Sequence, residues 1–225
     1  MAIFSGVNIN TSGLILSLDA SSNRSYSGTG NTWYDLSGNV KNFSLNNGPT
    51  YSSNNSGLIS FDGTNDNAEI SYTLTSNNIT VWSWFNSKVF SSASNLAGLI
   101  SNYDNATNGF DIRKNGSALQ LSLVTDVTIG NVNFINSVAN NTWYNIAFTY
   151  NGTSLTSYTN GLTIATTALT GTRRNGARIA LATSAYDFPT RVYACDISQV
   201  HIYNRALSAQ EIKNNFEATR DRYGI

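Results

Sequence analysis

The chain has 225 residues, of which 40% are hydrophobic and 12% are charged, and its 13 basic residues balance its 13 acidic ones. This length can bury a sizeable core, and the charged share is about half of the ~25% that is usual for soluble domains. The neutral balance does not favour nucleic-acid binding, which needs a basic surface, and the single cysteine excludes an internal disulfide.

The N-terminal segment, residues 1–12, has neither the basic start nor the long apolar run of a secretory signal peptide. No stretch of the chain approaches the roughly 18 consecutive apolar residues of a membrane-spanning helix. No linker rich in proline and glycine divides the rest of the chain. We therefore expect a protein made without export or membrane insertion, with an arm over residues 1–12 and one domain over residues 13–225.

Short runs in which apolar and small polar residues alternate follow one another along most of the chain. This period of two is typical of half-buried strands. The expected strands cover residues 14–20, 58–63, 68–74, 79–87, 119–124, 143–152 and 197–204. With polar turns between them, these runs predict an all-β fold, a two-sheet antiparallel jelly-roll sandwich.

The stretch FDGTNDNAEI, residues 61–70, contains three carboxylates. Asp62 and Gly63 form a turn dipeptide, and the alternation resumes towards the end of the stretch. Asp62, Asp66 and Glu69 are spaced four and three residues apart across this turn, so they do not share one strand face as a glycosidase acid pair would. The sequence therefore predicts a turn between two strands here.

The C-terminal segment has the pattern of a short helix. Ser208 and Glu211 stand at the N-cap and N3 positions of a capping box, and Leu207 and Ile212 at the positions of a hydrophobic staple. Ile212 and Phe216, four residues apart, give one apolar stripe. We expect one short C-terminal helix that packs on the sandwich.

Five segments together resemble a known family. They are GLILSLDAS (13–21), TWYDLSGN (32–39), LISFDGTNDNAEI (58–70), NTWYNIAFTYNG (141–152) and IYNRALSAQEI (202–212). In this order they resemble the concanavalin A-like lectin/glucanase superfamily, in its laminin G-like, pentraxin-like branch. The combination of TWYDLSGN early in the chain with IYNRALSAQEI before the final helix is similar to the lectin-like domains of tailed-phage virion proteins. The resemblance implies two packed antiparallel sheets of six or seven strands each.

The resemblance also implies a calcium site within SNYDNATNGFDI, residues 101–112, where pentraxin-like relatives carry an Asp-Asn pair. The matching candidates are Asp104 and Asn105, with Asn108 and Asp111 as helpers. Calcium takes oxygen ligands of this kind. The second acidic loop of such a site offers only Asp126 here, so a self-capped Asx turn is the alternative.

Aromatic side chains in loops are candidates for stacking on sugar rings, with nearby polar groups to bind hydroxyls. Trp33, beside Asp35, and the loop residues Tyr103 and Tyr186 have these features. The alternative for each aromatic residue is a place in the core.

Catalysis is not indicated by the remaining motifs. The only histidine, His201, lies in the strand-like run QVHIY, and no Gly-x-Ser-x-Gly elbow accompanies it. We interpret it as a surface or sheet-face histidine.

Two functions are compatible with these patterns. The first is a non-enzymatic phage virion surface protein, a capsid decoration, head-fibre or tail-associated subunit that is assembled in the host cytoplasm and displays a lectin-like module. Its expected partners are other virion proteins, cell-surface glycans and further copies of itself in a homo-oligomer. The second is a free-standing carbohydrate-binding lectin, with calcium dependence as an added feature.

Overall fold

The computed structural model describes residues 8–88, 96–104, 107–186 and 190–225. Sheet A consists of β1 (Leu14–Asp19), β4 (Thr50–Ser52), β5 (Leu58–Phe61), β7 (Ile79–Ser87), β12 (Trp143–Tyr150), β13 (Ser154–Thr159), β14 (Leu162–Ala168) and β16 (Cys195–Tyr203). Sheet B consists of β2 (Thr32–Trp33), β3 (Phe43–Asn46), β6 (Asn67–Ser71), β8 (Gly98–Ser101), β9 (Phe110–Asn115), β10 (Ala118–Val124), β11 (Ile129–Ile135) and β15 (Arg178–Leu181). The helical elements are η1 (Asn54–Ser56), α1 (Ala209–Glu217) and η2 (Arg220–Tyr223).

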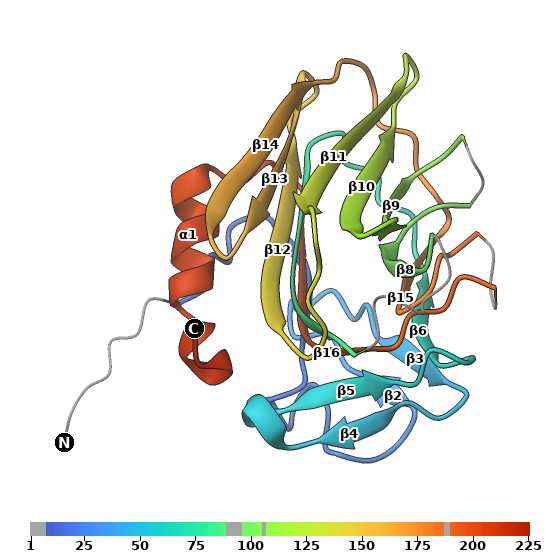
Figure 1. Ribbon diagram of the computed structural model, residues 1–225, viewed down its shortest axis with the longest axis vertical. Helices are drawn as coiled ribbons and strands as arrows, with labels where there is room; N and C mark the ends of the chain where they lie inside the picture. Colours follow the sequence, from blue (N-terminus) through green and yellow to red (C-terminus); the bar gives the residue numbers. More distant parts are fainter. Residues whose placement is uncertain (1–7, 89–95, 105–106, 187–189) are drawn as a thin grey trace.

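The two sheets are packed face to face (Figure 1). Sheet A is ordered β14-β13-β12-β7-β16-β5-β4, with β1 also pairing with β16, and sheet B is ordered β11-β10-β9-β8-β15-β6-β3-β2. The strand pairs are antiparallel. The predicted all-β sandwich with one short C-terminal helix is confirmed. Among the described residues, each sheet has eight strands rather than six or seven, because short strands such as β2 and β4 add to the edges.

The main core lies between the sheets. Strands β7 and β16, in the middle of sheet A, are buried almost throughout. Phe110 of sheet B meets Phe148 of sheet A edge to face, with ring centroids 5.2 Å apart. Alternation of aromatic and β-branched residues places such side chains on the inner faces, and their burial is the main source of stability.

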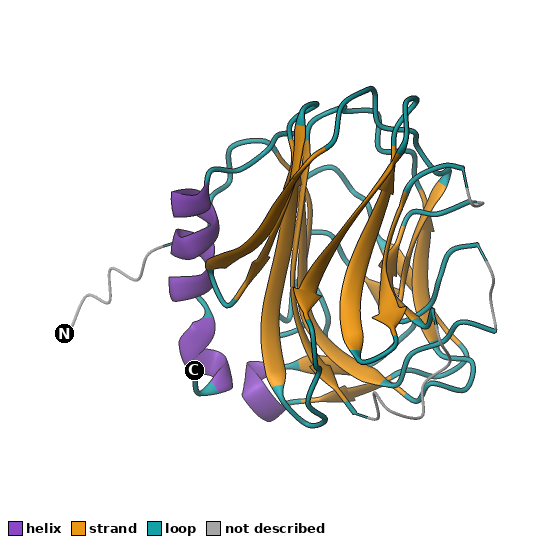
Figure 2. Cartoon of the chain, turned by 45° about the horizontal axis from the view of Figure 1, so that its top comes forward, coloured by secondary structure: helices purple, strands orange, loops and turns teal. Residues whose placement is uncertain are grey.

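A second apolar cluster joins the outer face of sheet A to α1 and η2. Figure 2 shows the C-terminal helical elements beside the strands of the sandwich. The indole of Trp84 packs against the rings of Phe216 and Tyr223, at centroid distances of 5.7 and 4.0 Å. The predicted capping box is confirmed: the Ser208 hydroxyl accepts from the Glu211 N–H at 3.3 Å, and the Glu211 carboxylate accepts from the Ser208 N–H at 2.8 Å. Local capping thus starts the helix where its apolar stripe can cover sheet A.

The segment 61–70 is the predicted turn between two strands, and it carries the chain from sheet A to sheet B. The Asp62 carboxylate accepts from the Thr64 N–H at 2.7 Å, and the Asp66 carboxylate accepts from the Asp62 N–H at 3.1 Å. Gly63 has a φ of +77°, and a Cβ there would lie 2.8 Å from the Ala194 nitrogen. Two of the three carboxylates therefore hold the turn.

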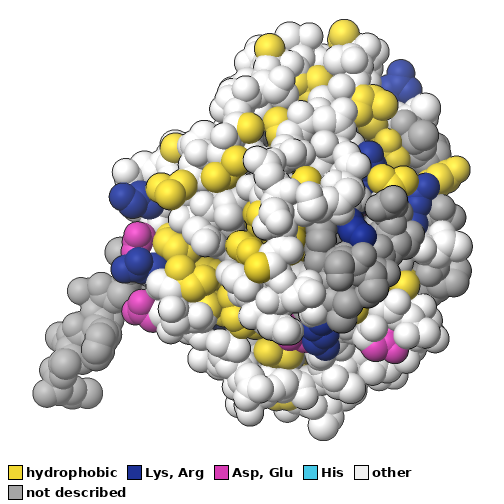
Figure 3. All heavy atoms as spheres, in the orientation of Figure 1, with side chains coloured by type: hydrophobic (Ala, Val, Ile, Leu, Met, Phe, Trp, Pro, Cys, Tyr) yellow, Lys and Arg dark blue, Asp and Glu magenta, His cyan; other side chains and the backbone are white. Residues whose placement is uncertain are grey.

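The surface agrees with the low charge of the chain. On the face shown in Figure 3, Lys, Arg, Asp and Glu side chains cover only a small part of the surface. Among the described residues, no helix has the length and apolar character needed to cross a membrane.

Candidate functional site

A row of facing residues crosses all eight strands of sheet B. Its members are Asn131, Ser122, Asp111, Ser101, Ala180, Glu69, Ser44 and Thr32. Facing residues on antiparallel strands point to the same side of the sheet. Phe110 and Ile112, on either side of Asp111 in the chain, lie in the core, so the row is on the outer face of sheet B. All of its members except Ala180 are polar.

The described parts of the connection from β15 to β16 contact sheet B beside this row, since the Gly98 N–H donates to the Arg191 carbonyl at 3.0 Å. Its two arms are joined by the bridge between Thr183 and Val192. The guanidinium of Arg178, at the outer-face start of β15, donates to the carbonyl of Ala185 in the connection. In the middle of the row, Ser101, Asp111 and Ser122 are fully buried.

Asp111 lies in a buried polar cluster. Its carboxylate is 3.4 Å from the Arg113 guanidinium, which also donates to the Ser122 hydroxyl at 2.9 Å. Burial raises the pKa of Asp111 to about 6, and the charge of Arg113 and the Ser101 hydroxyl only partly oppose that shift. This carboxyl group therefore titrates close to neutral pH.

Next to these buried residues, the outer face of sheet B is exposed to solvent. Glu69 and Arg178 form an ion pair at 3.2 Å, with side chains 39% and 37% exposed. Tyr186, which directly follows the tethered Ala185, is 48% exposed, and the Arg191 guanidinium lies 5.8 Å from its ring centroid. We call Glu69, Arg178, Tyr186 and Arg191 the outer-face site. It joins an exposed aromatic face to charged groups that can donate and accept hydrogen bonds.

The sequence-predicted pair Trp33 and Asp35 is not part of this site. Trp33 is fully buried in the main core, so its prediction as an exposed aromatic residue is wrong. The reason is that β2 pairs with β3 and directs the indole inward. The Asp35 carboxylate accepts from the backbone N–H groups of Ser17, Ser37 and Lys41 at 2.9–3.0 Å, and so it stabilises its own loop.

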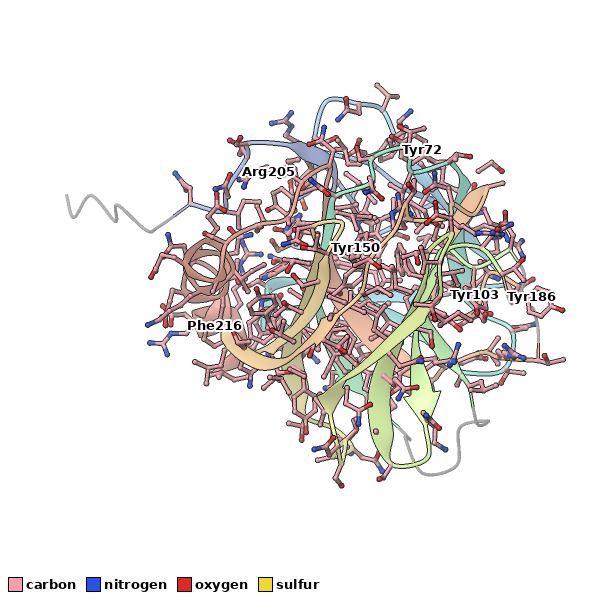
Figure 4. All side chains as sticks on the ribbon, turned by 90° about the horizontal axis from the view of Figure 1, so that it is seen from above. Tyr72, Tyr103, Tyr150, Tyr186, Arg205 and Phe216 are labelled. Atoms are coloured by element: carbon pink, nitrogen blue, oxygen red, sulfur yellow. The ribbon has the colours of Figure 1, made fainter. Side chains whose placement is uncertain are left out.

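The two predicted tyrosines differ. Tyr103 is only 6% exposed, so the prediction of an exposed ring at that position is wrong. Tyr186 is exposed as predicted, and its role in ligand binding remains a prediction. Figure 4 shows both at one end of the molecule, opposite Phe216 of α1.

The predicted calcium ligands do not form a site within the described residues. One carboxylate oxygen of Asp104 accepts from the Ala177 N–H at 2.7 Å. Asp111 is buried beside Arg113, whose positive charge would repel a cation. Asn108 is half-buried, and Asn105 lies outside the described residues. In the part of the chain that is described, no three His, Cys, Asp or Glu side chains gather as metal ligands. Among the described candidates, Asp104, Asn108 and Asp111 are therefore not gathered as a calcium site, and calcium binding that involves Asn105 remains a prediction.

The two carboxylates of the row do not have the separation of a glycosidase pair. Asp111 on β9 and Glu69 on β6 are three strand spacings apart, through β8 and β15. At about 4.8 Å per spacing this is about 14 Å. Retaining and inverting glycosidases need about 5.5 Å and at most about 9.5 Å. This pair is therefore too far apart for either glycosidase mechanism.

Sequence reasoning missed three members of the outer-face site. In the sequence, Glu69 belongs to the turn segment 61–70, although it stands at an outward position between the apolar Ala68 and Ile70. That alternation is a signal that could have placed it on a sheet face. Nothing local indicates that Arg178 pairs with Glu69 or that Arg191 lies beside the Tyr186 ring, because these positions depend on tertiary contacts of β15 and of the connection that follows it.

Comparison with known proteins gives a family model and a set of similar folds. The model described as concanavalin A-like lectin/glucanases superfamily matches residues 62–213. No curated protein matches the chain.

Among solved structures, the binding domain of Paraclostridial Mosquitocidal Protein 1 is 21% identical with a TM-score of 0.70, covering 91% of this chain and 52% of that one. The receptor binding domain of botulinum neurotoxin type G is 17% identical with a TM-score of 0.71, covering 92% and 51%. The binding domain of botulinum neurotoxin DC in complex with SialylT is 17% identical with a TM-score of 0.71, covering 93% and 52%. The chain thus spans about half the length of these chains, and the likeness is one of fold.

Proposed function

The chain belongs to the concanavalin A-like lectin/glucanases superfamily, and we propose from this premise that it is a non-enzymatic module that binds glycans at the outer-face site. The observation that carries the proposal is the half-exposed Glu69–Arg178 pair beside the exposed ring of Tyr186. A sugar ring presents C–H groups that pack on an aromatic face, and hydroxyls that accept from a guanidinium and donate to a carboxylate. The neutral, amide-rich surface favours uncharged glycans.

We further propose that the module is displayed on a phage virion, as a decoration, head-fibre or tail-associated subunit in a homo-oligomer. The support is the resemblance of TWYDLSGN and IYNRALSAQEI to lectin-like domains of phage particles, together with the low charge of the chain. A free-standing lectin is the alternative. Mass spectrometry of purified particles from a producing culture separates the two, because only a virion subunit stays with the particles through density-gradient purification.

Glycan binding is tested on an array with the whole chain, with calcium and with EDTA. We expect binding in both buffers, because the described candidates are not gathered as a calcium site, and at least a tenfold weaker signal for Tyr186→Ala. Tyr34→Ala is the matched control, since Tyr34 is 50% exposed but lies outside the outer-face site. Equal binding by the wild type and Tyr186→Ala, or no binding by the wild type, would contradict the proposed site.

A further inference from the structure

We propose that two copies of this chain associate through the free edge of β14, by antiparallel strand pairing beside the groove that separates β14 from β11. The proposal rests on the homo-oligomer included in the proposed function, and it names the surface that forms the contact. No residue of the outer-face site takes part, so association and glycan binding can fail separately.

The edge formed by β14 is exposed and uncharged. Within the described residues, β14 pairs with β13 alone and ends sheet A. None of its seven residues is buried, whereas three of the six residues of β13 are. Residues 151–172, which contain both strands, include no charged residue and no proline. Natural proteins use such residues to keep an edge strand from pairing with another chain, and β14 has none.

The other sheet edges in the described part of the chain are protected. β2 and β4 have only two and three residues, and very short edge strands pair poorly with another chain. The Ser17 carbonyl of β1 accepts from the Leu36 N–H at 2.8 Å, so a loop covers that strand. The Phe134 carbonyl of β11 accepts from the Thr159 hydroxyl of β13 at 2.9 Å, which joins that edge to sheet A. A further strand is therefore best accommodated at β14.

A groove with a volume of about 410 Å³ lies between β14 and β11. The residues that line it are Ile164, Ala165, Thr166 and Thr167 on β14, and Asn131, Val132, Asn133 and Asn136 on the side of β11. Its apolar side chains are thus accompanied by amides and hydroxyls, and none of its residues is charged. An apolar centre with a polar rim is the usual composition of a protein interface.

A bulge places the side chain of Ile164 in this groove. The register of β14 against β13 shifts between Thr163 and Ala165, so Ile164 is the additional residue. Bulges re-aim side chains, and Ile164 lines the groove while 48% of it is exposed. Residues 165–168 follow the bulge and pair regularly with β13. Their free side can therefore continue the hydrogen-bond ladder into a second molecule.

A second copy of the chain is the occupant that these features favour. Two identical antiparallel strands are related by a two-fold axis, so each copy presents the edge that the other needs. Like charges on such an edge would repel across the axis, and the uncharged β14 avoids this repulsion. Pairing would also remove apolar surface of Leu162 and Ile164, which are 64% and 48% exposed, from water.

The contact is small, which sets the kind of dimer to expect. The four regularly paired residues after the bulge span about 14 Å at ~3.4 Å per residue. Interfaces of limited area are typical of transient complexes. We therefore expect a dimer that forms reversibly and depends on protein concentration.

Sedimentation velocity of the full chain, over a concentration series that reaches about 1 mM, measures this association. We expect a monomer–dimer equilibrium for the wild type and at least tenfold weaker association for Ile164→Lys and for Thr166→Lys, because each brings like charges together across the axis. Val40→Lys is the matched control, since Val40 is 74% exposed in the loop between β2 and β3, and it should associate like the wild type. Thermal melting checks that the variants are folded.

A mixed sample tests whether the two edges meet directly. Ile164→Lys and Ile164→Glu should each associate weakly alone, and an equal mixture of the two should regain association, because opposite charges then face each other across the axis. Association that stays weak in the mixture of folded variants would contradict edge pairing.

Hydrogen exchange tests the wild type without a substitution. The backbone amides of residues 164–168 should exchange more slowly as the protein concentration rises, whereas those of β4 should not change. A monomer throughout the concentration series would overturn both this interface and the homo-oligomer, while the glycan array still decides the outer-face site. A dimer without added protection of β14, or unchanged association of both folded lysine variants, would overturn this interface alone.

Discussion

Replacement of Glu211 by alanine tests how the C-terminal helix is held on the sandwich. The Glu211 carboxylate closes the capping box with Ser208, accepts from the Arg205 guanidinium at 2.6 and 3.0 Å, and accepts from the Asn10 side chain at 2.7 Å. Loss of a cap costs about 1 kcal/mol, and loss of a partly exposed ion pair costs about 0.5–1 kcal/mol. We expect Glu211→Ala to lower the free energy of unfolding by about 1.5–2 kcal/mol, or Tm by about 3–8 °C.

The same change should alter the pH dependence of stability. The hydrogen bonds from Arg205, more than any other contact, lower the pKa of Glu211 from 4.5 to about 2. A carboxylate with a lowered pKa in the folded state stabilises the protein fully above its unfolded pKa, and that contribution is lost as the pH falls through the folded value. The stability gap between wild type and Glu211→Ala should therefore be full at pH 7 and narrow steadily between about pH 4.5 and pH 2.

The assay is urea denaturation followed by tryptophan fluorescence at pH 7, 5, 4 and 3. Glu217→Ala is the matched control on the same helix. Glu217 pairs with Arg220 at 2.9 Å, but the two side chains are 37% and 43% exposed, so its loss should change stability by less than about 0.5 kcal/mol. An equal loss in both variants, or a gap that does not narrow in acid, would refute the reasoning.

Three further predictions concern individual residues. Gly109→Ala should destabilise the fold by more than about 2 kcal/mol in urea denaturation, because φ is +93° and the new Cβ would lie 2.0 Å from the Asn102 carbonyl oxygen. A loss of stability below about 0.5 kcal/mol would contradict this close approach. Thr219→Val should cost about 1–3 kcal/mol, since the buried Trp84 indole N–H donates to the Thr219 hydroxyl at 2.8 Å, whereas Thr219→Ser should keep wild-type stability. Carboxyl ¹³C NMR should give Asp111 a midpoint near pH 6. Because that folded pKa is raised from 3.8, the free energy of unfolding of the wild type should fall as the pH rises from about 4 to 6. Asp111→Asn should remove that decline. A midpoint near pH 4 would show that burial does not determine the pKa of Asp111.

The sequence by itself determined the features that depend on neighbours a few residues apart. The capping box of Ser208 and Glu211 predicts the start of α1, because both partners lie within one turn. The alternation in residues 79–87 predicts β7 with the bounds that the structure has, because strand side chains point to opposite faces in turn. The dipeptide Asp62-Gly63 predicts the turn within residues 61–70, because its conformational preferences and side-chain hydrogen bonds are local.

Only the tertiary structure decided which of these elements meet. Trp33 and Tyr103 have loop-like surroundings in the sequence, and their burial depends on strands and loops from distant parts of the chain. The outer-face row collects one residue from each of eight strands, and the ion pair between β1 and η2 joins Asp19 to Arg222 across 203 positions. Periodicity fixes the side of a strand on which a residue lies, but strand order and the path of the connections fix its partners. The Glu69–Arg178 pair of the outer-face site is such a long-range pair.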